Sequence, residues 1–117
     1  MHARTSFGHA AEDLAADHLE RLGYQIVARN YRCAAGEIDV VAMRASLLVF
    51  CEVKARRDDR FGAPAEAVDR TKQLRLKRLA ARWLADHRPG AVDIRFDVVS
   101  VIVRDGRCEL THIPDAF

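Results

Sequence analysis

The sequence predicts an α/β fold in which a mixed β-sheet is flanked by helices, with the elements in the order α-β-β-β-α-β-β. Two observations predict it. Two segments carry apolar residues at three- and four-residue spacing, as one-sided helices do. Five shorter segments are rich in Val, Ile and Phe and are bounded by turn residues, as strands are. A chain of 117 residues, half of them hydrophobic, suits one compact domain over residues 1–117.

The first half of the chain predicts one helix followed by three strands. Apolar residues recur at helical spacing over residues 6–22, and Gly23 fits the end of that helix. Residues 24–31 are typical of a strand, and residues 33–36 form a turn. Residues 37–43 and 47–54 predict two further strands.

The second half predicts a loop, a helix and a final hairpin. Residues 55–64 are charged and contain Gly62 and Pro64, which favours a loop. A helix is expected over residues 65–87, where Pro89-Gly90 follows its end. Its apolar stripe consists of Leu76, Leu79, Ala80, Trp83 and Leu84. Residues 94–103 and 108–113 predict strands joined at Asp105-Gly106.

Composition narrows the class of protein. Cysteines at positions 33, 51 and 108 are odd in number and lack C-x-x-C spacing, which argues against a disulfide framework or zinc cluster. Acidic residues interrupt the first twenty positions, so no signal peptide is expected, and the longest apolar run, residues 47–51, is too short to span a bilayer. We therefore expect a cytoplasmic protein with reduced thiols and no membrane partner.

The segment that indicates chemistry contains Asp39, Glu52 and Lys54. Glu52 and Lys54 are two residues apart on one predicted strand, so they point to the same face. Asp39 lies on the preceding strand, and a hairpin loop with an even number of residues puts it on that face too. Either Ala45-Ser46 or the four residues 44–47 would serve, and the shorter loop would place Asp39 directly opposite Glu52.

Adjacent carboxylates repel each other unless a cation lies between them. Oxygen ligands suit Mg²⁺ or Mn²⁺, and a lysine beside the ion can orient water or stabilise developing charge. These are the parts that metal-assisted phosphodiester hydrolysis needs. The alternative is an ordinary half-exposed strand with alternating charges, since E-x-K alone is a weak signal. The buried run of residues 47–51 before Glu52 favours a functional site.

The arrangement G-E-I-D-V-V followed by F-C-E-V-K resembles the signature of the PD-(D/E)XK nuclease superfamily. More closely, the chain is similar to the small bacterial YraN family, whose members resemble archaeal Holliday-junction resolvases. The similar motifs are Gly8-x-x-x-Glu12, Gly36-Glu37-Ile38-Asp39, Glu52-Val53-Lys54, Glu66-Ala67-Val68, Lys72-Gln73 and Arg95-Phe96-Asp97-Val98-Val99. Together they cover nearly the whole chain.

The resemblance implies a restriction-endonuclease-like fold, with Asp39 and Glu52 as metal ligands and Lys54 as the catalytic lysine. It also implies that Glu12, on the first helix, is the acid that completes the site. Two departures stand out: Ile38 replaces the proline of the superfamily name, and the turn at residues 44–46 lacks the expected glycine.

Other charged residues receive structural interpretations. We expect Glu37 to point away from Asp39, so Glu37 is not expected to be a ligand. Asp97 follows Arg95 by two residues, which favours a structural ion pair. No two histidines have metal-ligand spacing.

A basic surface is expected on the second helix, although the formal net charge is only +2. Arg75, Arg78 and Arg82 share a face by their spacing, and Arg56 and Arg57 precede the helix. Such a surface suits a phosphate backbone, although many basic faces only confer solubility. The resemblance adds Lys72 and Gln73 as phosphate contacts.

We therefore expect a Mg²⁺- or Mn²⁺-dependent endonuclease acting on DNA, with branched and single-stranded DNA as candidate substrates. A homodimer is expected because resolvase-like relatives pair their subunits. One alternative is a nucleic-acid-binding module that keeps the nuclease fold without cutting. Another is a protein-interaction role in which the basic helix binds an acidic partner.

Overall fold

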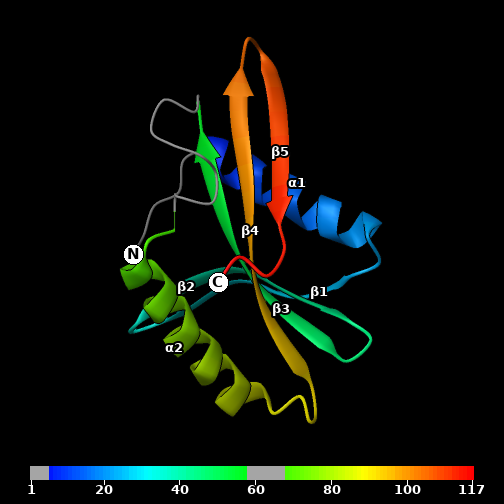
Figure 1. Cartoon of the computed structure of the whole chain (residues 1–117), viewed down its shortest axis with the longest axis vertical. Helices are drawn as coiled ribbons and strands as arrows, with labels where there is room; N and C mark the ends of the chain where they lie inside the picture. Colours follow the sequence, from blue (N-terminus) through cyan, green and yellow to red (C-terminus); the bar gives the residue numbers. More distant parts are fainter. Residues whose placement is uncertain (1–5, 58–67) are drawn as a thin grey trace.

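The computed structural model describes residues 6–57 and 68–117, and its elements follow the predicted order (Figure 1). The two helices are α1 (Ser6–Arg21) and α2 (Arg70–His87). The five strands are β1 (Gln25–Cys33), β2 (Gly36–Arg44), β3 (Leu47–Arg56), β4 (Asp93–Arg104) and β5 (Arg107–Ile113). The α/β class and the order of elements predicted from the sequence are confirmed.

The five strands form one mixed sheet in the order β1-β2-β3-β4-β5. Three neighbouring pairs are antiparallel, and β3 and β4 are parallel. A parallel pair needs a long crossover, and the segment that contains α2 supplies it. The central strand is β3, which pairs with β2 on one side and β4 on the other, and β1 and β5 form the two edges.

The helices cover opposite faces of this sheet, with α2 in front and α1 behind in Figure 1. One core forms where Ala11, Ala15 and Leu19 of α1 pack on the sheet, and the other where Leu76, Leu79 and Trp83 of α2 do. Within residues 6–57 and 68–117, neither helix is long and apolar enough to cross a membrane.

The start of α2 differs from the prediction. Val68 and Asp69 are not helical, because Asp69 has an extended backbone (φ −77°, ψ 174°) and its carboxylate accepts a hydrogen bond from the Lys72 amide. Asp69 is therefore the N-cap, and the prediction of helix at residues 68 and 69 is wrong. The strand β3 also continues to Arg56, beyond its predicted end. The rest of the predicted loop, and residues 65–67, lie outside the described residues apart from Arg57.

The turn between β2 and β3 is the two-residue loop Ala45-Ser46, since Arg44 pairs with Leu47. Ala45 has φ 52°, a left-handed conformation in which glycine has no steric penalty and alanine does. The turn that lacks the expected glycine therefore contains a strained alanine. Of the two loops left open by the sequence, the shorter is correct.

A buried polar network joins α1, β4 and β5. Asp97 is fully buried and accepts hydrogen bonds from the Arg95 guanidinium (2.8 Å) and the Asp115 amide (3.0 Å). His112 lies 2.7 Å from the same carboxylate, and its other ring nitrogen lies 3.0 Å from His18. The predicted ion pair between Arg95 and Asp97 is confirmed. The contact between His18 and His112 links residues 94 apart, which spacing does not reveal.

This network shifts two acid–base equilibria. Burial alone would raise the pKa of Asp97, but hydrogen bonds from His112, Arg95 and Asp115 outweigh it and lower the pKa to about 2. Burial lowers the pKa of His18, and the positive charges of His112 and Arg21 lower it further. Both shifts make the folded chain less stable in acid than at neutral pH.

Stability should fall in two steps as pH is lowered. The folded pKa of His18 lies below its ordinary 6.5, so protonation favours the unfolded chain and stability decreases below about pH 6.5. The folded pKa of Asp97 is about 2 against an ordinary 3.8, so its contribution is complete above about pH 4 and lost as pH falls toward 2. Urea denaturation at a series of pH values measures both steps.

His18→Gln should flatten the first step, and His9→Gln, at an exposed position of the same helix, should not. Asp97→Asn should lower the free energy of unfolding by roughly 3–5 kcal/mol, because Arg95 then remains without its carboxylate partner. An unchanged pH profile in His18→Gln would show that the network is not the origin of the first step.

Candidate functional site

Asp39 and Glu52, the two acids predicted to face each other, lie where β2 separates from β3, and both line one cavity. The paired residues end at Val40 and Cys51, and the next step in the same register places Asp39 opposite Glu52. At this point the Asp39 carboxylate accepts a hydrogen bond from the Val53 amide (2.9 Å). A side chain therefore takes the place of a backbone acceptor, and the hairpin opens at Asp39.

Strand alternation also breaks at Asp39. Ile38 lies in the core beneath α2, whereas Val40, two residues later, lies in the core beneath α1. In a regular strand, residues two apart share a face. The chain therefore twists at Asp39, between Ile38 and Val40.

Three carboxylates lie close together at this point in the fold. Glu12 from α1 and Glu37 and Asp39 from β2 have oxygen atoms that all lie within 4.8 Å of one another, and we call these residues the acidic cluster. The prediction that Glu37 points away from Asp39 is wrong. Glu12 is only 3% exposed, because α1 packs closely on the sheet through Ala11 and Ala15.

Glu52 and Lys54 lie beside the acidic cluster but are not part of it. The Lys54 ammonium is 3.6 Å from the Glu52 carboxylate. Burial raises the pKa of Glu52, the charge of Asp39 raises it further, and Lys54 and Arg75 act in the opposite direction. Burial lowers the pKa of Lys54, and a hydrogen bond with Lys72 lowers it further. Both groups are therefore strongly influenced by charges on neighbouring elements.

A cavity of about 380 Å³ opens onto these residues. Its walls are formed by Arg32, Cys33, Gly36, Glu37, Asp39, Glu52 and Arg75. Gly36 has φ 137°, and a side chain there would meet the Arg75 and Leu79 side chains of α2 at 3.5 and 3.6 Å. These are ordinary contact distances, so the positive φ rather than a lack of space favours glycine here. Arg75 lies close to the β1–β2 turn, so the cavity has both carboxylate and guanidinium walls.

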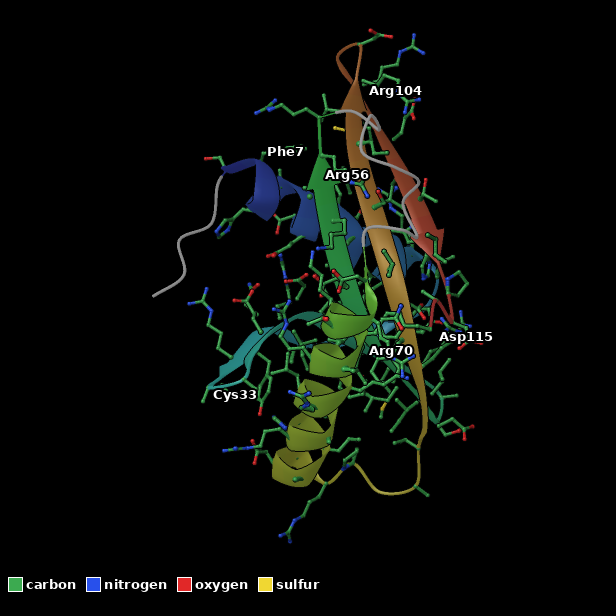
Figure 2. The ribbon with its side chains drawn as sticks, turned by 60° about the vertical axis from the view of Figure 1, so that its left-hand side comes forward. Phe7, Cys33, Arg56, Arg70, Arg104 and Asp115 are labelled. Atoms are coloured by element: carbon green, nitrogen blue, oxygen red, sulfur yellow. The ribbon has the colours of Figure 1, made fainter. Side chains whose placement is uncertain are left out.

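The other predicted phosphate-binding residues divide by location. Lys72 lies close enough to Lys54 for its positive charge to lower the pKa of Lys54, whereas the Gln73 side chain donates to the Val68 carbonyl. Arg78 is exposed, and Arg82 pairs with Asp86 (3.2 Å). Arg56, the last residue of β3, is half-buried and lies toward the same end of the molecule as Phe7 (Figure 2). The Arg57 guanidinium, one residue after β3, lies over the Phe7 ring. The structure therefore brings Lys72 and Arg75 close to Glu52. The other predicted phosphate-binding residues lie outside the cavity walls.

Arg32 and Glu37 are site residues that the sequence analysis missed. They are cross-strand partners in the β1–β2 hairpin, and the Arg32 Nε donates to the Glu37 carboxylate at 2.9 Å. A signal was available, because a two-residue turn at residues 34 and 35 places positions 32 and 37 opposite each other. Opposite charges at such positions predict a contact.

Comparison with known proteins gives a consistent result. Residues 11–101 match the model of the uncharacterised protein family UPF0102. A UPF0102 protein of Frankia casuarinae is 46% identical over 118 residues that span the whole of both chains. One from Frankia alni is 48% identical over 118 residues, covering 100% of this chain and 98% of its own. A UPF0102 protein of Dictyoglomus thermophilum is 46% identical over 96 residues, which cover 82% of this chain and 81% of its own.

The acidic cluster should bind Mn²⁺, and its neutralised variants should not. Glu12→Gln, Glu37→Gln and Asp39→Asn should each weaken Mn²⁺ binding by at least about tenfold. Without metal, each variant should be as stable as the wild type or more so, because repulsion between carboxylates is relieved. Calorimetric titration and thermal unfolding measure the two effects.

Asp13→Asn is the matched control, since Asp13 follows Glu12 on α1 but is exposed and pairs with Arg29. Glu52→Gln tests whether Glu52, which the sequence predicts as a metal ligand but which lies outside the acidic cluster, contributes to Mn²⁺ binding. Variants of the cluster that bind Mn²⁺ as tightly as Asp13→Asn does would contradict a metal site there.

Proposed function

The chain belongs to the uncharacterised protein family UPF0102, and we propose that it is a Mg²⁺- or Mn²⁺-dependent endonuclease that hydrolyses phosphodiester bonds in DNA. The observation that carries the proposal is a cavity lined by Glu37, Asp39, Glu52 and Arg75. Glu12 lies close to Glu37 and Asp39, and Lys54 lies close to Glu52. Carboxylates, a lysine and an arginine are the groups that metal-dependent phosphate hydrolysis combines.

The donor set fits a hard divalent cation. Glu12, Glu37 and Asp39 offer only oxygen ligands, and their ligand atoms are close enough together to contact a single ion. Oxygen-only sets suit Mg²⁺ and Mn²⁺, whereas structural zinc sites use Cys and His. When bound, such an ion polarises a phosphate oxygen and makes a bound water more acidic. Among this chain's residues, Glu12, Glu37 and Asp39 would hold the ion, with Glu52 lining the same cavity as Glu37 and Asp39.

Lys54 is the residue proposed to act on the reacting phosphate. It lies beside Glu52 on the same face of β3, where the nearby carboxylates favour its charged form. An ammonium held at this place can orient the attacking water or stabilise negative charge on the phosphate as the bond breaks. Glu52 keeps Lys54 at the cavity, because their charged groups are 3.6 Å apart.

The basic residues of α2 are proposed to hold the DNA backbone. Arg75 lines the cavity, Lys72 lies next to Lys54, and Arg78 and Arg82 continue the exposed face of the helix. This alignment lets adjacent phosphates of one strand contact the helix while one phosphate occupies the cavity. Cutting both strands of a duplex or junction needs two cavities, so the proposal includes a homodimer.

Cleavage of labelled DNA tests the proposal directly. Purified protein is incubated with linear duplex, single-stranded and four-way-junction DNA in Mn²⁺, Mg²⁺ or EDTA. We expect metal-dependent cutting that EDTA abolishes. Lys54→Ala should bind Mn²⁺ nearly as the wild type does yet cut roughly 10²–10³-fold more slowly, because its role is in the transition state.

The control for this assay is Lys77→Ala, which removes an exposed lysine near Phe96 and Phe117, outside the cavity walls. A wild type that binds Mn²⁺ and DNA but cuts none of the three substrates would replace the enzyme with a non-cutting nucleic-acid-binding module.

The basic face of α2 should contribute to DNA binding through charge. Converting Arg75, Arg78 and Arg82 to Glu should weaken binding to all DNA sequences alike. It should also make the logarithm of the affinity fall less steeply with the logarithm of the salt concentration, by the equivalent of up to about three phosphate contacts. A variant with Arg21, Arg29 and Arg104 changed to Glu carries the same net charge and serves as the control. Fluorescence anisotropy at several salt concentrations gives both quantities. Equal affinities and slopes in the two triple variants would contradict a phosphate-binding role for α2.

A further inference from the structure

The ion pair between Arg32 and Glu37 lies at the proposed metal site. The two residues face each other across the β1–β2 hairpin, with the Arg32 Nε 2.9 Å from the Glu37 carboxylate. Glu37 is also one of the three acids whose oxygens lie within 4.8 Å of one another. A guanidinium therefore already contacts a carboxylate that belongs to the acidic cluster.

Arg32 is also the part of this pair that can move. Its side chain is 44% exposed, whereas that of Glu37 is 16% exposed. Ion pairs open to water contribute little to stability, because solvent screens them and ordering a long side chain costs entropy. Moving Arg32 away from Glu37 is therefore inexpensive, while Glu37 stays beside Asp39 and Glu12.

Arg32 has a second anion within reach whenever substrate is bound. It lines the same cavity as Asp39, Glu52 and Arg75, which is where the proposed function places a phosphate. A guanidinium carries five N–H donors in a planar fork that matches phosphate oxygens. Arg32 and Arg75 come from β1 and α2, so a phosphate in the cavity would lie between cations from two elements.

On the basis of the proposed metal site, we infer that Arg32 is a positioning residue that exchanges partners: it neutralises Glu37 while no metal is bound and pairs with the substrate phosphate once metal has taken its place. A divalent cation and a guanidinium both need the negative charge of Glu37, so they compete for it. Displaced from Glu37, Arg32 is left beside the cavity, where a phosphate is its nearest new partner. Metal and DNA binding are thereby coupled through one side chain.

A purely structural role for the pair predicts something else. A cross-strand ion pair can simply stabilise a hairpin. Loss of Arg32 would then disorder Glu37 and weaken the binding of metal and DNA together. The exchange of partners requires effects of opposite sign, with metal binding tighter and DNA binding weaker.

The test is Arg32→Gln, which keeps hydrogen-bonding capacity but removes the charge. Calorimetric titration with Mn²⁺ alone should give a dissociation constant about threefold to tenfold lower than that of the wild type, as expected for loss of one nearby, partly solvated charge. DNA binding is measured in the Lys54→Ala background with Mn²⁺ present, so that no cutting occurs. There Arg32→Gln should weaken the affinity for labelled DNA by a similar factor.

Two further variants isolate the cause. In the Glu37→Gln background, Arg32→Gln should no longer tighten Mn²⁺ binding, because the competition is for that carboxylate. Arg104→Gln is the matched control. Arg104 pairs with Glu109 at 3.4 Å and its side chain is 39% exposed, but it lies at the far tip of the β4–β5 hairpin, remote from Cys33 at the β1–β2 turn (Figure 2).

The outcomes separate the inference from the proposed function. Mn²⁺ binding that is unchanged or weakened by Arg32→Gln, in a wild type that binds Mn²⁺ and cuts DNA, overturns the exchange of partners and leaves the nuclease standing. A wild type that binds no Mn²⁺ overturns the metal site and the inference with it. Opposite shifts in Mn²⁺ and DNA affinity that vanish in the Glu37→Gln background support the inference.

Discussion

The hydrogen bond from the Val53 amide to the Asp39 carboxylate determines how the site around it is arranged. By taking over a backbone position, the carboxylate ends the pairing of β2 with β3 after Val40 and Cys51. It also accompanies the twist that directs Ile38 and Val40 to opposite cores. An acid used in this way has its position fixed by the main chain of the neighbouring strand. Such fixing is what a metal ligand requires, because geometry set in advance costs nothing at the moment of binding.

The fold accommodates its buried acids in two contrasting ways. Asp97 is fully buried and is surrounded by Arg95, His112 and a backbone amide, so its charge is balanced by its own neighbours. In the acidic cluster, three carboxylates approach one another beside a cavity, and the cations around them lie on the walls. The first arrangement stabilises the fold. The second concentrates negative charge where a ligand can enter, which is the distinction expected between a structural and a binding site.

Sequence reasoning succeeded where the pattern was local and failed where it was not. The apolar spacing located both helices, and the count between Asp39 and Glu52 gave the correct register, because a two-residue turn leaves little freedom. The predicted orientation of Glu37 was wrong, since residues two apart on a strand share a face, and Glu37 accordingly lies beside Asp39. The contact of His18 with His112 depends on how α1 lies across the sheet, and no spacing encodes that. The motifs led to the correct family, but a family and a fold do not by themselves establish an activity.

The acidic cluster exists only after the chain has folded, and this follows from where its members originate. Glu37 and Asp39 belong to β2, but Glu12 arrives from a helix that reaches the sheet through Ala11, Ala15 and Leu19. Small side chains at two of these positions keep the helix axis close, so a carboxylate on a buried turn can reach the strand. Larger residues there would move α1 outward and take Glu12 from the cluster while leaving β2 and β3 as they are. The packing of α1 is therefore part of the site, and the sequence of its apolar face carries functional as well as structural information.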